Sequence, residues 1–320
     1  MSRGLRVVSC ALLASAVSLP AAAQSLPSYA PLSPVAAGRS GLTTQPWVTP
    51  GKQWQFSLLT DYGSLIEYVE PGDVSYLLDA EVLRVQLGVT RRLGGKGFLL
   101  ADASFNGAYH GFLDGFLDWY HDVIGVQLAG REQRPRNAFA YEIQLAGDRG
   151  YQYARTSGFL GDLRLGGGLR HSRHWQSALS VTLPTGKGPS GYRRGTLSLN
   201  GTTLLRSEFL ERFVYEGSLS LGYTPTYGEL SDLQRKTFVM VTQGIRGRVS
   251  GVLHAYGNLS YHSPYYRGTG MRALDRRELT IDVGGMLRFP RGPEWLFGLT
   301  EDLEPSGPAV DVVFRLGARW

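Results

Sequence analysis

The chain has 320 residues, a formal net charge of +6 and a single cysteine, Cys10. One cysteine excludes a disulfide framework and a cysteine metal site. Beyond the first twenty residues the chain has no apolar run of ~18 residues, which excludes a bundle of transmembrane helices.

Residues 1–23 have the pattern of an export signal. Arg3 and Arg6 form a positive start, an apolar run ends near Leu19, and three alanines follow at 21–23. This order of positive, apolar and small-residue segments predicts a cleavable signal peptide. In an exported chain the basic balance favours contact with phosphate-bearing lipid over nucleic acid.

Residues 24–51 form a leader that is rich in proline and shows no periodicity. We expect it to be extended, and to lie in the periplasm or in the mouth of the folded domain. Its prolines are Pro27, Pro31, Pro34, Pro46 and Pro50.

Segments of about ten residues with alternating polarity follow, and this pattern is typical of a membrane β-barrel. Val85, Leu87 and Val89 alternate with Arg84 and Gln86. A charge between apolar neighbours is costly toward lipid but ordinary toward a watery lumen. The predicted strands are 53–61, 78–92, 97–109, 160–171, 175–183, 195–206, 213–223, 237–248, 251–261, 278–289, 294–302 and 309–320. The charges expected to line the lumen and tune its selectivity are Arg84, Asp282, Arg315 and Arg319.

Short and long connections alternate along the chain, as in barrels with short periplasmic turns and longer outer loops. Residues 139–146 also read as a strand, which would make the number of spans odd. We therefore assign 139–145 and 151–156 to a hairpin that turns at 148–150 outside the membrane. Twelve strands remain, with ten or fourteen as alternatives, and residues 110–159 become one long outer insertion within a barrel domain spanning 52–320.

The insertion begins with GFLDGFLDWYHDVIG, where apolar residues recur every three to four positions. This spacing predicts a short amphipathic helix. Three aspartates share one row, where like charges oppose a helix unless they are compensated. Two interpretations stay open: a helix that plugs the pore, held by Asp–Arg pairs, or a surface helix. The residues of the plug or gate would be Phe112, Asp114, Phe116, Asp118, Trp119, His121, Asp122, Arg131, Arg134 and Arg136.

The last strand places Phe314, Leu316 and Trp320 on one face, with Arg315 and Arg319 on the other. A chain that ends within a strand on an aromatic residue resembles the C-terminal signal of bacterial outer-membrane barrels. The resemblance implies that the barrel-assembly machinery reads this strand.

The segment 111–137 carries GF-D-F-----HD--G followed by GR---RP-N. It resembles a proteobacterial family of outer-membrane proteins described only as a domain of unknown function. A weaker likeness covers 158–186, a strand-turn-strand unit similar to barrels associated with aromatic and other hydrophobic compounds. The resemblance implies an outer-membrane barrel and no established activity.

The sequence contains two weak candidates for a functional site, one for a metal ion and one for catalysis. Asp118, His121 and Asp122 could face one cation, but they have no second cluster. His171–Ser172 and His262–Ser263 are adjacent and would face opposite sides of a strand. We therefore predict no catalytic residue, no metal and no cofactor, and a protein that is not an enzyme.

The sequence as a whole predicts a monomeric, all-β, antiparallel up-and-down barrel of about twelve strands, with one short helix in a long loop. Its location would be the outer membrane of a Gram-negative bacterium, among lipid and lipopolysaccharide. The expected function is a channel or transporter for a small solute, hydrophobic solutes included, with 110–159 narrowing the pore. The alternatives are a closed structural or lipopolysaccharide-interacting barrel and an outer-membrane lipid hydrolase.

Overall fold

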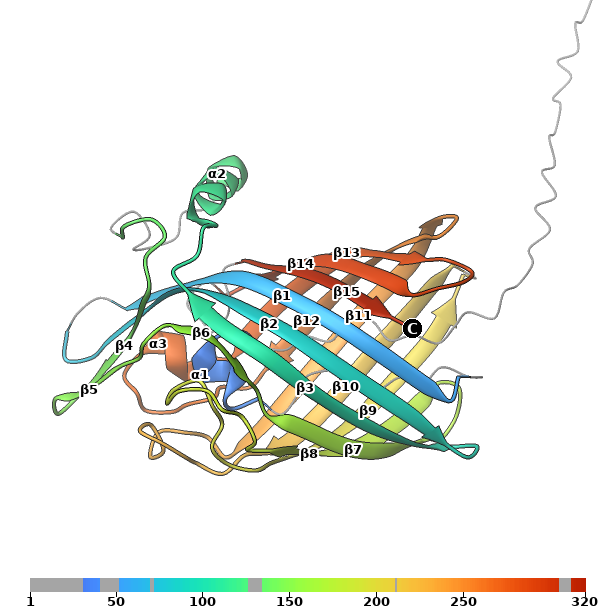
Figure 1. The fold of residues 1–320 in the computed structure, drawn as a ribbon, viewed down its shortest axis with the longest axis horizontal. Helices are drawn as coiled ribbons and strands as arrows, with labels where there is room; N and C mark the ends of the chain where they lie inside the picture. Colours follow the sequence, from blue (N-terminus) through green and yellow to red (C-terminus); the bar gives the residue numbers. More distant parts are fainter. Residues whose placement is uncertain (1–30, 41–51, 70–71, 126–133, 211, 305–311) are drawn as a thin grey trace, which may run out of the picture.

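Strands with an apolar outer face and a polar inner face can satisfy their main-chain hydrogen bonds in lipid only by closing into a barrel. The computed structural model describes residues 31–40, 52–69, 72–125, 134–210, 212–304 and 312–320. Twelve of its described strands form one closed antiparallel barrel (Figure 1). They are β1 (Trp54–Val69), β2 (Ser75–Leu93), β3 (Gly97–Tyr109), β7 (Leu163–Arg170), β8 (Trp175–Leu183), β9 (Ser198–Phe209), β10 (Phe213–Tyr223), β11 (Thr237–Ser250), β12 (Leu253–His262), β13 (Glu278–Arg288), β14 (Glu294–Asp302) and β15 (Val312–Arg319).

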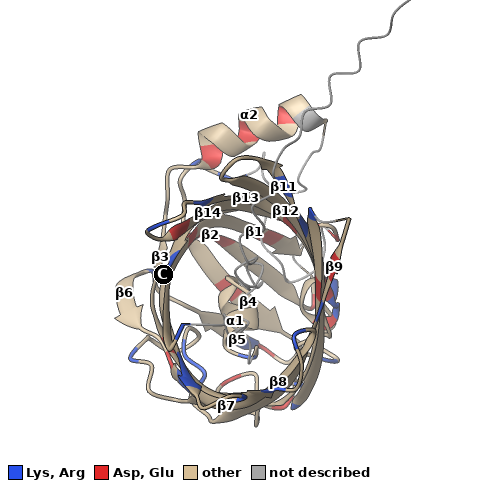
Figure 2. Cartoon of the chain, turned by 90° about the vertical axis from the view of Figure 1, so that its right-hand side faces the viewer, with Lys and Arg blue, Asp and Glu red and all other residues tan. Residues whose placement is uncertain are grey.

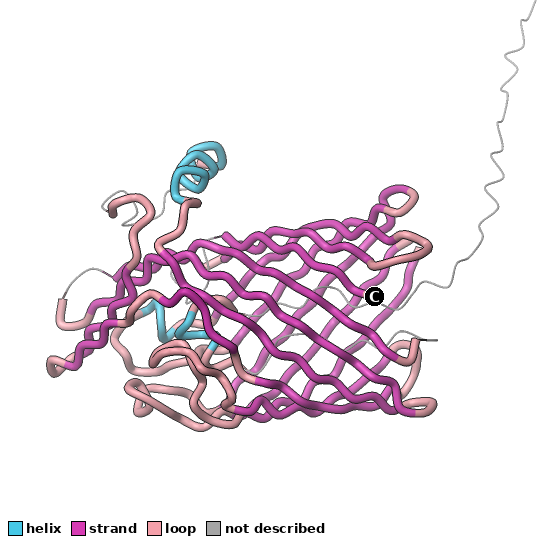
Figure 3. Tube along the Cα trace, viewed as in Figure 1, coloured by secondary structure: helices cyan, strands magenta, loops and turns pink. Residues whose placement is uncertain are grey.

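Closure joins the first strand of the barrel to the last. β1 pairs with β2 on one side and with β15 on the other, where Ser57 lies opposite Arg319. The short turns and the C-terminus lie at one end of the barrel, and the helices lie toward the other (Figure 3). Because short turns face the periplasm in such barrels, the end with the helices is the outer end. The predicted fold class and strand number are confirmed.

Three further strands decorate the outer end. β4 (Ala140–Leu145) and β5 (Arg149–Gln152) form a hairpin, and β4 pairs with the outer part of β2, where Gln144 lies opposite Ser75. The three-residue turn 146–148 carries positive φ at Gly147 and Asp148, a conformation that glycine and aspartate tolerate better than most residues. β6 (Thr156–Leu160) pairs with β3. The predicted hairpin is therefore present outside the barrel, with β5 starting two residues before the predicted strand.

The described helices are α1 (Pro34–Ala37), α2 (Asp114–Ile124) and α3 (Arg272–Asp275). α2 is the helix expected from the spacing of its apolar residues, and Gly125 ends it in the left-handed conformation at φ 71°. In the described part of the chain, each helix is too short or too polar to cross a membrane. α1 lies inside the ring of strands, and α2 lies outside it (Figure 2).

Candidate functional site: a leader segment inside the barrel

Residues 31–40 of the leader occupy the outer half of the lumen. Val35 and Ala36 of α1 are buried in a cluster with Tyr76 and Leu78 of β2, whose side chains point inward. Tyr266 and the short helix α3 cover the segment from the opposite wall. Of the two places expected for the leader, the described part therefore lies in the barrel mouth. Residues 1–30 and 41–51, which include the predicted signal peptide, lie outside the described residues.

Side chains of the wall hold the main chain of this segment. Arg84 Nη1 donates to the carbonyl oxygen of Pro31 at 2.9 Å, and the Tyr266 hydroxyl donates to that of Val35 at 3.0 Å. Arg194 donates to the carbonyl oxygen of Ser40. Each contact satisfies a buried carbonyl group that would otherwise cost free energy.

The segment also reaches out to the loops of the mouth. Arg39 donates to the carbonyl oxygens of Thr224 at 2.7 Å, Pro225 at 2.8 Å and Arg235 at 2.6 Å. Burial lowers the pKa of Arg39 and lowers that of Arg194 to about 10, so the Arg194 guanidinium group stays charged at neutral pH. Asp162 Oδ2 lies 3.4 Å from Arg194 Nε and offsets part of the cost of burying that charge.

A network of charges lines the lumen below the segment. Arg84 Nη2 donates to Asp61 Oδ2 at 2.6 Å, and Arg315 Nε donates to Asp61 Oδ1 at 2.8 Å. Arg315 Nη1 also donates to Asp282 Oδ2 at 2.8 Å. Arg319 lies on the same inward row of β15, toward the periplasmic end. The structure thus places all four expected lumen charges on the inner face of the wall.

Further ion pairs follow around the lumen. Arg164 of β7 pairs with Asp102 of β3 at 2.6 Å. Nearer the periplasm, Arg288 pairs with Glu294 at 2.9 Å, and Arg206 lies 3.4 Å from Glu216. The inner wall is therefore charged along its length, with carboxylates and guanidinium groups interleaved.

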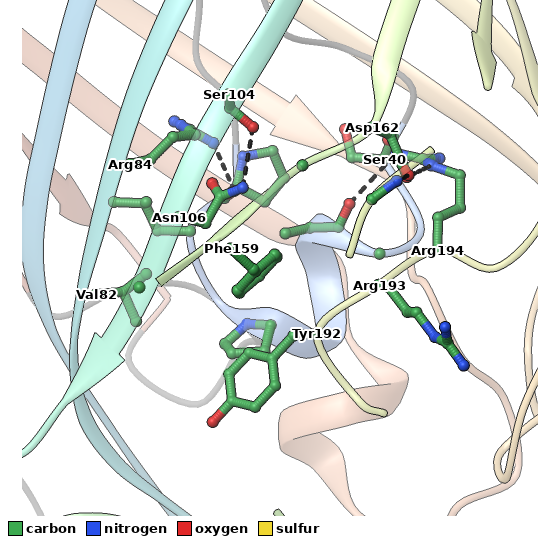
Figure 4. A pocket seen from close by; sticks show the side chains of 18 residues that line it. Ser40, Val82, Arg84, Ser104, Asn106, Phe159, Asp162, Tyr192, Arg193 and Arg194 are labelled. Carbon is green, nitrogen blue, oxygen red and sulfur yellow. Dashed lines mark hydrogen bonds and ion pairs between the residues drawn. The ribbon is translucent and has the colours of Figure 1, made fainter. Parts of the chain in front are cut away.

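A cavity of about 110 Å³ lies between the leader segment and the wall (Figure 4). On the wall side, Phe159, Tyr192 and Val82 offer apolar surface, while Asn106 and Arg84 offer hydrogen-bond donors. Its other side is formed by the leader residues Pro31, Leu32, Pro34, Ala37, Gly38 and Ser40. The cavity could hold a small solute with an apolar body and an acceptor group.

The insertion is divided between the lumen and the outer wall. Its hairpin sends Tyr141 and Tyr153 into the buried cluster at the mouth, where their ring centroids lie 4.3 Å apart. Helix α2 instead packs on the outer face: Leu113 and Leu117 bury Val312, and Phe116 meets Phe314 at 5.7 Å between centroids. Val312 and Phe314 belong to the outward row of β15. The helix is therefore not in the lumen, because its apolar side finds its partners on the lipid-facing wall.

The start of α2 is attached to a carboxylate of that outer face. Glu81 Oε1 accepts the main-chain N–H groups of Phe112, at 2.6 Å, and Leu113. The Tyr62 hydroxyl donates to the other oxygen of the same carboxylate, and the Tyr120 hydroxyl donates to Glu301. Polar contacts at the wall thus hold the start of the helix and a residue in its second half.

An expected Asp–Arg pair is present on the helix among the described residues. Arg136 pairs with Asp118 at 2.9 Å, whereas Asp114 accepts the main-chain N–H of Asn137. Arg134 pairs with Asp79 of β2 at 3.1 Å rather than with the helix. Arg131 lies outside the described residues.

Of the other plug candidates on the helix, Phe116 and Trp119 are in contact, with ring centroids 5.7 Å apart. His121 is buried beside Tyr120, with ring centroids 5.5 Å apart, while Trp119 and Asp122 are exposed. Within the residues that the structure describes, no group of three or more His, Cys, Asp or Glu side chains could hold a metal ion.

The histidine–serine neighbours do not form nucleophile–base pairs with each other. His171 Nε2 lies 2.7 Å from the Ser177 hydroxyl, and its ring stacks on Trp175 at an exposed turn. His262 bonds through Nδ1 to the main-chain oxygen of Ser263, 2.6 Å away.

Sequence reasoning placed Arg84 in the lumen, but it did not find the contact of Arg84 with the leader or the other residues that hold this segment. Asp61, which joins two arginines, is a charged residue at the end of the predicted strand 53–61, and its position there was the one signal. Arg39 and Arg194 carried none: one is in an aperiodic segment and the other in a loop, and only the folded chain brings them together.

A closed barrel of this topology, with apolar residues outside and ion pairs inside, defines an outer-membrane β-barrel protein. The chain belongs to a family of proteins of unknown function, DUF3187, whose model matches residues 6–320. No curated protein matches the chain.

Solved structures share the fold. The COG4313 outer membrane channel from Pseudomonas putida F1 is 12% identical with a TM-score of 0.53, and the alignment covers 85% of this chain and 98% of that one. The NanC porin is 6% identical with a TM-score of 0.47, over 82% and 98%. The CymD monoaromatic hydrocarbon channel is 11% identical with a TM-score of 0.43, over 90% and 91%. The fold matches outer-membrane proteins of Gram-negative bacteria.

Proposed function

We propose that this protein is an outer-membrane channel for a small solute, closed in its outer half by residues 31–40 of its own leader. The observation that carries the proposal is the position of this segment inside the barrel, with Ala36 fully buried. The Pseudomonas putida protein that shares the fold is a channel, which agrees with this assignment.

The way in which the segment is held suits a reversible closure. The wall contributes the side chains of Arg84, Arg194 and Tyr266, and the leader contributes main-chain oxygens. Such bonds can be exchanged for bonds to water, because the lumen charges keep partners of their own, as Arg84 does in Asp61. Release of the segment would leave a charged, hydrated lumen.

The tyrosines of the hairpin add to the closure at the mouth. The Tyr153 hydroxyl donates to Glu229 Oε2 at 2.7 Å, which ties the insertion to the loop that follows β10. In this proposal the insertion 110–159 narrows the pore through its hairpin, and α2 has a separate role.

The cavity beside the leader segment is the proposed resting place of the solute. Phe159 and Tyr192 suit an apolar body, and Arg84 with Asn106 suits an acceptor such as a carboxylate or carbonyl oxygen. A solute bound there would compete with Pro31 for Arg84, and so would favour release of the leader.

Conductance across planar bilayers tests the proposal. A variant with residues 31–40 replaced by ten glycine and serine residues keeps the chain length and removes the buried contacts. We expect larger single-channel steps than in the unaltered protein. A matched variant with α2, residues 114–124, replaced in the same way should conduct as the unaltered protein does. No steps in the leader variant, with the barrel shown to be folded, would instead establish a closed structural barrel.

A further inference from the structure

Helix α2 has three faces, and two of them have partners within the protein. One face, with Leu113, Leu117 and Phe116, packs on the wall. The second, with Asp114 and Asp118, meets the segment at 136–137. The third face carries Trp119 and Val123, which are 59% and 65% exposed, and Phe112, just before the helix, is 71% exposed beside it.

The orientation of the helix places this third face relative to the membrane. Figure 2, viewed along the barrel axis, shows α2 lengthwise beside the ring of strands, whereas Figure 1 shows it nearly end-on. The helix therefore runs across the barrel axis, parallel to the membrane plane. A helix in this orientation can lie in the boundary between head groups and acyl chains.

The polar side of the helix faces the outer medium. Asp114 and Asp118 contact Asn137 and Arg136, which lead into β4, and β4 pairs with the outermost part of β2. The exposed apolar face lies on the opposite flank of the helix, because Trp119 and Val123 are far around its circumference from these aspartates. This flank faces the membrane.

The apolar face also continues the lipid-facing surface of the barrel. On the outward row of β15, Leu316 is exposed to lipid, whereas Phe314 and Val312 are covered by α2. The outward apolar surface thus continues from β15 onto the helix. Phe112 stacks on Tyr62 of β1 at 5.5 Å between centroids, at the level where interfacial aromatic residues gather.

We propose that α2 is an interfacial helix that inserts Phe112, Trp119 and Val123 among the acyl chains of the outer leaflet, just below the head groups. The occupant of the exposed face is lipid, because the face adjoins the lipid-facing wall and lies on the membrane flank of a helix parallel to the membrane. The helix would fix the height of the barrel in the membrane and cover the seam where β1 meets β15.

Site-directed quenching tests the proposal. The chain has one cysteine, Cys10, which lies in the predicted signal peptide, so single cysteines can be introduced into a chain that starts at residue 24. A bimane label on Val123→Cys would be compared with one on Asp122→Cys, the neighbouring exposed residue on the polar flank. Leu179→Cys, 74% exposed in the middle of β8, marks the acyl region.

The proteins would be reconstituted in phosphatidylcholine–phosphatidylglycerol vesicles that contain lipids with a doxyl group at carbon 5 or carbon 12. We expect the label at 123 to be quenched several-fold more by 5-doxyl lipid than the label at 122, and the label at 122 to be quenched more by aqueous iodide. The label at 179 should respond most to 12-doxyl lipid.

Two results would overturn the proposal. Equal quenching of the labels at 122 and 123 by iodide, with little effect of doxyl lipid, would place the apolar face in water. Protection of the label at 123 from both quenchers would mean that a protein surface, such as a second copy of the chain, covers it. Neither result depends on conductance, so the outcome is independent of the proposed channel function.

Discussion

Arg84 on β2 donates to the main-chain oxygen of Pro31 at 2.9 Å, across 53 residues of sequence. The same guanidinium group pairs with Asp61 at 2.6 Å. The Arg84 side chain thus links the leader to the charge network of the lumen. Its removal should loosen the leader and also change the charge of the lumen.

We expect Arg84→Met to increase the open-channel probability. Loss of a charged hydrogen bond costs about 1.5–3 kcal/mol, which shifts the equilibrium between held and released leader roughly 10- to 100-fold. Single-channel recording measures the shift. Arg288→Met is the matched control, because it breaks a pair with Glu294 at 2.9 Å toward the periplasmic end of the barrel, away from residues 31–40. Equal effects of the two variants on gating would show that the leader contact is not the cause.

Labelling of Ala36→Cys should report the position of the leader directly. Ala36 is fully buried, so we expect its cysteine to react with a maleimide at least ten times more slowly than Leu210→Cys, which is 77% exposed at a periplasmic turn. Adding Arg194→Met removes the bond to Ser40 and should speed labelling at 36 only. Rapid labelling of Ala36→Cys in the otherwise unaltered protein would contradict a closed resting state.

The barrel could be predicted because its strands are specified by local alternation. On β2, Arg84 and Gln86 point into the lumen, whereas Val85 and Leu87 face lipid. This alternation follows the polarity of the sequence residue by residue. The helix could be predicted for the same reason, since the spacing of Phe112 and Phe116 is local.

The location of the helix and the contacts of the leader could not be predicted in this way. Leu117 would be apolar whether it faced the lumen or the outer wall, and only Val312, almost two hundred residues later, decides between them. Arg39 of the leader binds main-chain oxygens of the mouth loops, and Arg194 of a mouth loop binds a main-chain oxygen of the leader. Any residue type supplies such oxygens. Such contacts leave no pattern in the sequence.

Arg315 should be the most sensitive of the lumen charges to substitution. It donates to Asp61 and Asp282, both at 2.8 Å, so Arg315→Met leaves two buried carboxylates without this partner. Removing one partner of a buried ion pair costs about 3–5 kcal/mol. Urea unfolding of the folded barrel measures the loss. Adding Asp282→Asn removes one of the two carboxylate charges that lost Arg315 as a partner, and should restore part of the free energy of unfolding. If this free energy does not recover, the buried charge is not the cause of the loss.

Gly111→Ala should detach the start of α2. Gly111 has φ 65°, and a Cβ there would lie 1.9 Å from the carboxyl carbon of Glu81, which binds the first N–H groups near the helix. Strain at positive φ alone costs about 1–2 kcal/mol. Trypsin should then cleave after Arg136 faster than in the unaltered protein. Gly115→Ala lies in open space within the helix and should slow cleavage, because alanine favours the helix by roughly 0.5–1 kcal/mol. Faster cleavage in both variants would show that α2 does not depend on the Glu81 contact.

Trp320→Ala tests the C-terminal signal expected from the sequence. The Trp320 N–H donates to the Phe56 oxygen at 3.1 Å, the Phe56 N–H returns a bond at 3.0 Å, and the rings stack at 6.0 Å between centroids. We expect a several-fold smaller fraction of heat-modifiable, folded barrel in outer membranes, since Trp320 takes part in closure of the barrel and is also the proposed signal for the assembly machinery. Trp175→Ala is the control, because Trp175 lies at the same end of the barrel with 45% exposure against 46%. Refolding in detergent separates the two causes: a variant that refolds normally but assembles poorly in cells has lost the signal. Equal assembly of both variants in cells would remove Trp320 from that signal.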